Sequence, residues 1–270
     1  MNEKIKSLEE ILRRHSPRPG NPVNTLQDID NIKVLVWTFA KTGTSTLADS
    51  FQHSIDGTSG WKNVTHSHAE SCWFDQISKE LNHIGFSFKL LIEFINSKGI
   101  RPLVIQSYRC PVEILISTYF HLVENGSKDK NSSNLNQLFN TLKFPGQAEY
   151  IRHLKKTFKG IWTHDFNKEE GFGFNLGDSY DTIYTTIDSI NNIPRNIKSI
   201  KELKDYHNLT IKTSNEHKSE SAYKTFKNNL AFKKGAINHL YDIHSEPLNF
   251  FYTRDSIKNM LDSALQKYEQ

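Results

Sequence analysis

Several features that would settle a protein class are scarce in this sequence. It has only two cysteines, Cys72 and Cys110, in 270 residues. They form no Cys-x-x-Cys pair and no cysteine–histidine spacing of a zinc site, which argues against a disulfide scaffold and a structural zinc. No apolar run approaches the roughly 18 residues of a membrane span, and the charged residues 1–15 lack the apolar core of a signal peptide. We therefore expect a cytoplasmic protein with free thiols and no membrane span.

Charge of one sign is not in strong excess either. The chain has 34 Lys and Arg against 30 Asp and Glu, which gives a net charge of +4. The basic residues are spread along the chain, whereas nucleic-acid-binding domains cluster them on one face or element. The mild excess of base favours an anionic ligand and predicts no nucleic acid partner. A mean hydropathy of −0.59 is typical of a polar globular protein.

The hydrophobic pattern predicts alternating strands and helices. After a helix over residues 3–14 and a linker to residue 25, we expect strands at 32–39, 61–66, 101–109, 181–187 and 209–213, and helices at 45–54, 87–98, 111–125 and 147–158. This order implies an α/β fold, with a parallel sheet flanked by helices on both faces. The C-terminal third is expected to be helical, with one interruption near SEPLNFFY. We expect one domain over residues 1–270, with a mobile loop at 125–137.

The first predicted strand leads into the segment KTGTST, residues 41–46. Unpaired N–H groups and the helix dipole favour an anion at such a helix start, and Gly43 lets the backbone approach closely. Lys41 could reach the outer oxygens of the anion. Its position differs from the Walker A pattern, in which the lysine stands just before Ser or Thr. The segment predicts a P-loop-like site for a phosphate-like group; the alternative is an ordinary strand–helix turn with an exposed lysine.

A second anion-binding pattern lies in YRCPVEILISTYFH, residues 108–121. Arg109 stands at the end of a predicted strand, and Ser117 follows about two helical turns into the next helix. Ligands of open parallel sheets bind outside the carboxyl ends of the strands, which is also where KTGTST is expected. A guanidinium and a hydroxyl both suit a phosphate. The alternatives are a surface salt bridge for Arg109 and a helix-surface hydroxyl for Ser117.

The two patterns together resemble a known family. FAKTGTSTL resembles the 5′-phosphosulfate loop of the sulfotransferase superfamily, YRCPVEILISTYFH resembles its 3′-phosphate motif, and both come in the family order. The resemblance implies an enzyme that uses 3′-phosphoadenosine 5′-phosphosulfate (PAPS) and no metal. Arg109 and Ser117 would then hold the 3′-phosphate, and Lys41 would also stabilise the leaving phosphate. The 5′ end would be held by Lys41, Thr42, Gly43, Thr44, Ser45 and Thr46.

Three further segments carry a weaker likeness. THDFNKEEGFGFN, NEHKSESAYKTFKNNLAF and FFYTRDSIKNML resemble parts of a bacterial family of capsular polysaccharide synthesis proteins that is itself sulfotransferase-like. This likeness implies a carbohydrate as the acceptor. Lys218, Lys224 and Lys227 in the second segment are candidates for closing over the 3′-phosphate. The alternative for these lysines is a solvated helix face.

Sulfuryl transfer to a hydroxyl needs a base within hydrogen-bond reach, and histidine suits this role at neutral pH. THSH, residues 65–68, follows the second predicted strand and resembles the histidine-bearing segment of many sulfotransferases. His66 and His68 are both candidates, and we favour His66; Glu70 is a reserve. The rival functions are an ATP-dependent P-loop-type kinase and a non-catalytic carbohydrate-binding protein of the same fold. The sequence predicts no particular oligomeric state.

Overall fold

The computed structural model divides the chain into two compact units. Unit 1 holds Met1–Phe39, Gly43–Ser107 and His164–Ser214, and unit 2 holds Ala40–Thr42, Tyr108–Thr163 and Asn215–Gln270. The single domain that the sequence predicts stays a prediction. The structure describes residues 3–15, 28–38, 42–58, 62–67, 78–124, 147–158, 162, 164–212 and 220–269. The expected linker at 16–25 and the expected loop at 125–137 lie outside these ranges.

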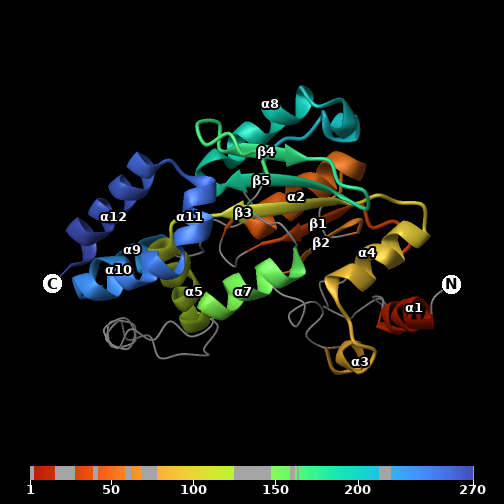
Figure 1. Ribbon diagram of the computed structural model, residues 1–270, viewed down its shortest axis with the longest axis horizontal. Coiled ribbons are helices and arrows are strands. Elements are labelled where there is room, and N and C mark those ends of the chain that lie inside the picture. Colours follow the sequence, from red (N-terminus) through yellow and green to blue (C-terminus); the bar gives the residue numbers. More distant parts are fainter. Residues whose placement is uncertain are drawn as a thin grey trace. The chain divides into compact units, whose positions relative to one another are not determined.

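A five-stranded sheet in the order β2-β1-β3-β5-β4 forms the frame of unit 1 (Figure 1). All of its residues belong to unit 1 except Tyr108, the last residue of β3, which belongs to unit 2. Its strands are β1 Val34–Trp37, β2 Val64–Ser67, β3 Leu103–Tyr108, β4 Phe172–Asn175 and β5 Asp181–Thr186. β1 pairs in parallel with β2 and β3, whereas β4 pairs antiparallel with β5. The α/β class with a mostly parallel sheet is confirmed, and the parallel sheet expected from the sequence is corrected at β4.

Helices cover both faces of this sheet within unit 1. Side chains of a strand alternate between the faces. Val34 and Val36 join a buried core with Leu47 and other residues of α2 (Thr44–Asp56), η3 (Ile187–Asn192), α8 (Ile193–Lys198) and η4 (Lys201–Tyr206). Trp37 lies on the opposite face, where its ring meets Phe88 of α4 (Phe88–Ser97) edge-on at 5.0 Å. The expectation of helices on both faces is confirmed.

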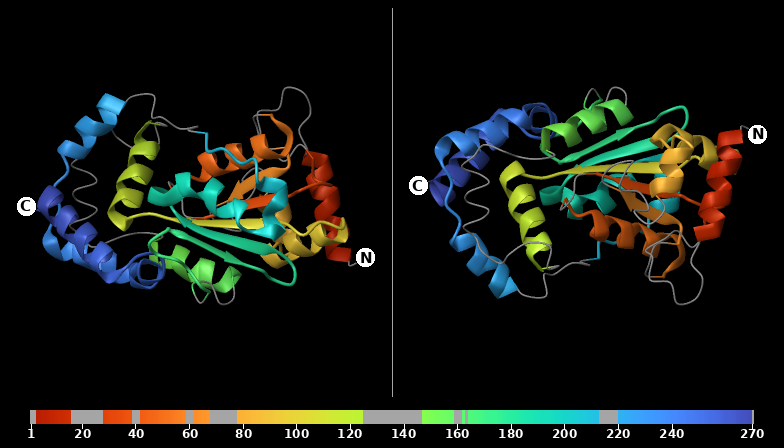
Figure 2. Two further views of the ribbon diagram at one scale, coloured as in Figure 1. Left: turned by 90° about the horizontal axis from the view of Figure 1, so that it is seen from above. Right: turned by 90° about the horizontal axis from the view of Figure 1, so that it is seen from below.

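The N-terminal helix α1 (Glu3–His15) packs against α4 (Figure 2). Ion pairs reinforce this packing, since Lys98 Nζ lies 2.8 Å from Glu9 Oε1 and 3.0 Å from Asp30 Oδ1. The predicted helix at 87–98 is confirmed together with its ends: Ser87 caps α4 by accepting from the Leu90 N–H, and Gly99 follows the helix at φ 77°. A short helix, α3 (Ser78–His83), precedes α4.

Unit 2 is helical in its described parts. Its helices are α5 Pro111–Glu124, α7 Gln147–Thr157, α9 Glu220–Asn228, α10 Lys234–Ile243, α11 Ser245–Phe251 and α12 Arg254–Tyr268. α9 packs on α5 through the stacked rings of Tyr119 and Phe226, 6.1 Å apart. The helical C-terminal third is confirmed over the described residues 220–269. The interruption expected near SEPLNFFY is found as two breaks instead of one: most of the segment forms α11, with breaks at His244 before it and at Tyr252 and Thr253 at its end.

Two expected strands differ from the structure. The second strand is Val64–Ser67 instead of 61–66, because the Gln52 side chain accepts from the N–H groups of Asn63 and Val64 at 2.7 and 3.1 Å and holds the chain just before it. The strand expected at 209–213 is wrong over its described residues 209–212. There Leu209 is buried in the core, and the Lys212 N–H donates to Ser50 Oγ at 2.9 Å instead of to a neighbouring strand.

Candidate functional site

The predicted 5′-phosphosulfate loop leads into α2. Lys41 lies outside the described residues, and Thr42 is buried. Gly43 is the N-cap of α2, with a left-handed φ of 83°. A Cβ at this position would lie 2.6 Å from Ile187 Cδ1 and 3.0 Å from Ile190 Cδ1. The left-handed backbone conformation therefore favours glycine here, and a Cβ would also displace the tips of two isoleucine side chains, whatever the loop binds.

The rest of the motif forms the first turn of α2. Thr44 is buried, and Ser45 and Thr46 are half-buried. The Leu47 N–H donates to the Gly43 carbonyl at 2.9 Å, so regular helical bonding begins directly after the motif. The N–H groups of a first helical turn have no acceptor within the helix and carry the positive end of its dipole. This turn has the chemistry of an anion site.

Backbone groups and the Thr38 hydroxyl tie the carboxyl ends of the three parallel strands together within unit 1. The Thr38 N–H donates to the Ser67 carbonyl at 3.1 Å, and the Ser107 N–H donates to Thr38 Oγ1 at 3.0 Å. The sequence analysis missed this arrangement. Its signal was a polar residue directly after or at the end of a buried apolar strand. These bonds fix the strand ends from which the candidate segments continue.

The predicted base is placed differently from the expectation. His66 is the third residue of β2, is paired in register with Val36, and is half-buried. The expectation that THSH follows the second strand is therefore corrected, because Thr65, His66 and Ser67 all belong to that strand. His68 and Glu70 lie outside the described residues. The choice among the three candidates stays a prediction.

The predicted 3′-phosphate residues Arg109 and Lys227 meet at a carboxylate within unit 2. Lys227 Nζ lies 2.7 and 2.8 Å from the two oxygens of Glu113, and Arg109 Nη2 lies 3.3 Å from Glu113 Oε2. The Tyr268 hydroxyl lies 3.5 Å from Glu113 Oε1. We call Arg109, Glu113 and Lys227 the Glu113 cluster. It joins the start of α5 to α9.

Ser117 is connected to the same cluster through Tyr223. Lys227 Nζ lies 5.4 Å from the centre of the Tyr223 ring. Burial raises the pKa of Tyr223 most and Glu113 raises it further, whereas Arg109 and a hydrogen bond with Ser117 lower it. Lys227 thus lies beside this ring, and Arg109 and Ser117 act on the pKa of its hydroxyl. Lys224 is exposed on α9, and Lys218 lies outside the described residues.

Sequence reasoning missed Glu113 and Tyr223 as parts of this group. A signal for Glu113 existed, because it stands four residues after Arg109 and four before Ser117, a spacing that puts helical residues on one face. Tyr223 has the same spacing to Lys227 on α9, four residues before it, but an aromatic side chain is not a usual phosphate ligand. Its place beside α5 depends on how α9 packs on that helix, which no local pattern in the chain encodes.

A buried hydrogen-bonded chain supports the segment that carries Arg109. The Tyr108 hydroxyl lies 2.7 Å from His244 Nδ1, and His244 Nε2 lies 3.0 Å from Gln147 Oε1. The Tyr108 ring stacks on Phe251 at 5.2 Å. Burial lowers the pKa of His244 to about 3, so its imidazole is neutral at physiological pH. This histidine anchors the residue before Arg109 and is not placed to titrate near neutrality.

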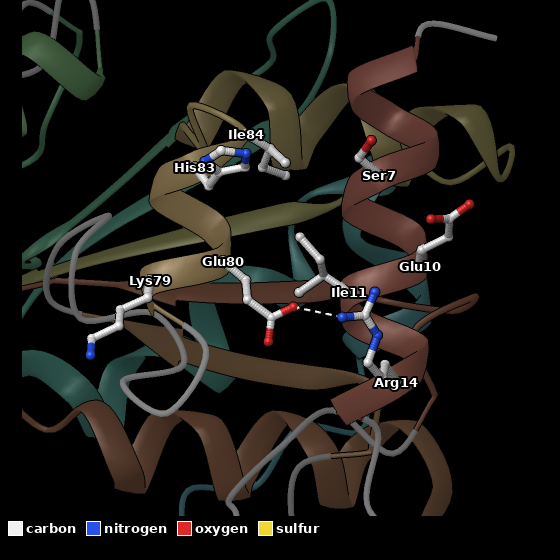
Figure 3. A pocket seen from close by; sticks show the side chains of 8 residues that line it. All are labelled: Ser7, Glu10, Ile11, Arg14, Lys79, Glu80, His83 and Ile84. Atoms are coloured by element: carbon white, nitrogen blue, oxygen red, sulfur yellow. Dashed lines mark hydrogen bonds and ion pairs between the residues drawn. The ribbon is translucent and has the colours of Figure 1, made fainter.

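A separate hollow of about 500 Å³ lies between α1 and α3 in unit 1 (Figure 3). Arg14 Nη1 reaches across it to Glu80 Oε2 at 2.9 Å, and Ile11 and Ile84 line it as well. Its lining carries charges of both signs and includes none of the predicted site residues. The hollow therefore contributes nothing to the candidate cofactor site.

The described residues show no metal site, no membrane-spanning helix and no disulfide. Within the described ranges, no three His, Cys, Asp or Glu side chains are grouped so that they could hold a metal ion. Of the helices described, none combines the length and the apolarity of a membrane span. Cys110 is a free thiol, and Cys72 is not among the described residues.

Comparisons with protein-family models, curated proteins and solved structures find no match. The sulfotransferase resemblance therefore stays a prediction based on the sequence motifs.

Proposed function

We propose that this chain is a PAPS-dependent sulfotransferase that moves a sulfuryl group from PAPS to a hydroxyl of a carbohydrate. The observation that supports the proposal best is that Arg109 and Lys227 both reach the Glu113 carboxylate in unit 2. Sequence motifs in two segments far apart along the chain predicted these two residues as phosphate ligands. Their meeting at one carboxylate is expected if they bind one anionic ligand group.

The chemistry of that group suits a phosphate. A guanidinium and an ammonium bind phosphate oxygens through charge-assisted hydrogen bonds, and a serine hydroxyl adds a third donor. Arg109 and Lys227 are held on half-buried surfaces, where electrostatic attraction is screened less than in open water. The Glu113 cluster would hold the 3′-phosphate of the nucleotide.

The 5′ end of the nucleotide would bind at residues 41–46. The first-turn N–H groups of α2 and the hydroxyls of Thr44, Ser45 and Thr46 would surround the 5′-phosphate, with Thr42 and Lys41 before them. Lys41 would stabilise the negative charge that grows on the bridging oxygen as the sulfur–oxygen bond breaks. This assignment rests on the resemblance of FAKTGTSTL to the family loop.

The acceptor hydroxyl must lose its proton as its oxygen attacks sulfur. His66 or His68 would take that proton, with Glu70 in reserve, and 3′,5′-adenosine bisphosphate would leave as the product. The carbohydrate nature of the acceptor rests on the likeness to the capsular polysaccharide family. PAPS brings the group to be transferred, so the proposal requires no metal.

Calorimetric titration with 3′,5′-adenosine bisphosphate, and with ADP and Mg²⁺ in parallel, tests the proposal. We expect micromolar binding of the bisphosphate and at least about tenfold weaker binding by an Arg109→Ala variant, because a charge-assisted contact is lost. Arg195→Ala is the matched control, since Arg195 makes an exposed ion pair with Glu170 in unit 1. Equal or tighter binding of ADP would favour the kinase, and no binding of either nucleotide would favour a non-catalytic protein.

A further inference from the structure

A carboxylate lies among the basic residues that we propose for the 3′-phosphate. Both oxygens of Glu113 accept from Lys227 Nζ, at 2.7 and 2.8 Å, and one of them also faces Arg109 Nη2 at 3.3 Å. A carboxylate and a phosphate offer similar oxygens to the same cations. Both cations of the cluster are therefore already bonded to an anionic group of the protein itself.

The charges of the cluster indicate what Glu113 does there. Arg109 and Lys227 carry two positive charges, and Glu113 reduces their sum to one. Two cations held this close repel each other unless an anion lies between them. Glu113 lets both side chains occupy one place before a ligand arrives, and it holds Lys227 of α9 beside α5.

Partial burial makes this ion pairing stronger than an ordinary surface contact. The side chains of Glu113 and Lys227 are 23% and 16% exposed. Lys155 and Glu246, which form another ion pair of unit 2, are each about half exposed. Solvent and salt screen the exposed pair more strongly. A phosphate that binds Arg109 and Lys227 must displace Glu113 or share the cations with it, and either event weakens its binding.

We infer that Glu113 is an internal counter-ion that competes with the ligand's phosphate for Arg109 and Lys227. It sets how tightly the 3′-phosphate is held and how readily the product nucleotide leaves. The inference rests on the proposed function, because it requires the 3′-phosphate to bind at the Glu113 cluster. Glu113 is a positioning and affinity-setting residue, without a part in the bond changes.

Glu113→Gln tests the inference, because glutamine keeps the size and an acceptor oxygen but removes the charge. The affinities of 3′,5′-adenosine bisphosphate and of 5′-AMP, which lacks the 3′-phosphate, are measured by calorimetry. We expect the variant to bind the bisphosphate about fivefold to tenfold more tightly and to release it correspondingly more slowly, because a nearby negative charge is gone. Its affinity for 5′-AMP should stay unchanged.

Two further variants serve as controls. Glu246→Gln changes the net charge of the chain equally but at the exposed pair, and should alter neither affinity. Glu113→Asp keeps the charge, and should leave the bisphosphate affinity within about twofold of the wild type. A gain in Glu113→Asp as large as in Glu113→Gln would overturn the counter-ion role.

The outcomes separate this inference from the proposed function. If the wild type prefers the bisphosphate to 5′-AMP, but Glu113→Gln binds it no more tightly while keeping its 5′-AMP affinity, the counter-ion role is overturned and the proposed function stands. If only Glu113→Gln shows the preference, Glu113 excludes the 3′-phosphate from the wild type, and both the proposed function and the affinity-setting role are overturned. If neither protein shows it, both ideas are overturned.

Discussion

Replacement of His244 by asparagine should remove a large part of the acid sensitivity of this protein. His244 is fully buried between Tyr108 and Gln147, and burial lowers its pKa from 6.5 to about 3. Gln147 Oε1 is an acceptor, so His244 Nε2 carries the hydrogen and Nδ1 accepts from the Tyr108 hydroxyl. A second proton on this imidazole would place a positive charge in a buried site.

The sign follows from which state binds the proton first. Between pH 6.5 and about 3 the unfolded chain carries a protonated His244 and the folded chain does not, so the free energy of unfolding falls as the pH falls through this range. Above pH 6.5 the imidazole is neutral in both states, and the stability that depends on its neutral form is fully present. Each pH unit below 6.5 costs about 1.4 kcal/mol, so a change from pH 7.5 to pH 5 removes about 2 kcal/mol through this residue alone.

Urea unfolding at pH 7.5, 6.5, 5.5 and 5.0 measures this effect. The His244→Asn variant should be less stable than the wild type at pH 7.5, because asparagine leaves a cavity and loses one hydrogen bond. Its further loss between pH 7.5 and pH 5 should be smaller by about 2 kcal/mol. His83→Asn, at an exposed position on α3, controls for the exchange itself. An equal acid loss in His244→Asn and the wild type, or an imidazole signal of His244 that titrates near pH 6.5 in NMR spectra, would refute the reasoning.

Two further predictions concern unit 1. Gly43→Ala should lower the free energy of unfolding by about 2 to 3 kcal/mol, because it combines a left-handed φ with a Cβ 2.6 Å from Ile187. Gly57→Ala has the same backbone strain but open space around the new Cβ, and should lower the free energy of unfolding by about 1 kcal/mol. Equal losses for the two variants in urea unfolding would contradict this prediction. Lys98→Met should cost about 1 kcal/mol through its pairs with Glu9 and Asp30, while Lys89→Met, at an 86% exposed side chain, should change the urea midpoint little.

Strands were predictable where the chain shows short, nearly continuous apolar runs. β1 and the first half of β3 lie within such runs and were found. β4 was missed because FGFN contains a glycine, which usually weakens a strand. In the structure a Cβ on Gly173 would lie 2.8 Å from the Asp165 carbonyl oxygen, so this strand needs glycine to let another backbone segment approach. That requirement comes from tertiary packing and is invisible in the sequence.

The false strand at 209–213 illustrates the opposite error. LTIKT has the β-branched composition of a strand, but composition only indicates that a segment fits a half-buried pleated surface. Leu209 is buried in the core, and the Lys212 N–H donates to the Ser50 side chain on α2 instead of to a neighbouring strand. The chain satisfies its polar backbone through a side chain of a helix, a choice that local propensity does not encode.

The candidate site was predictable in its cations and not in its balance of charge. A motif names the residues that suit a ligand, so Arg109, Ser117 and Lys227 could be chosen for a phosphate from their types and positions. The same reasoning treats each cation as available to the ligand, yet Lys227 is bonded by both oxygens of Glu113 and Arg109 faces one of them. Because those ion pairs must be exchanged or shared when a phosphate binds, the affinity of this site reflects a difference between two sets of charge-assisted bonds. A count of basic residues therefore overstates how tightly the site holds an anion. The negative charge of Glu113, which such a count ignores, is the reason.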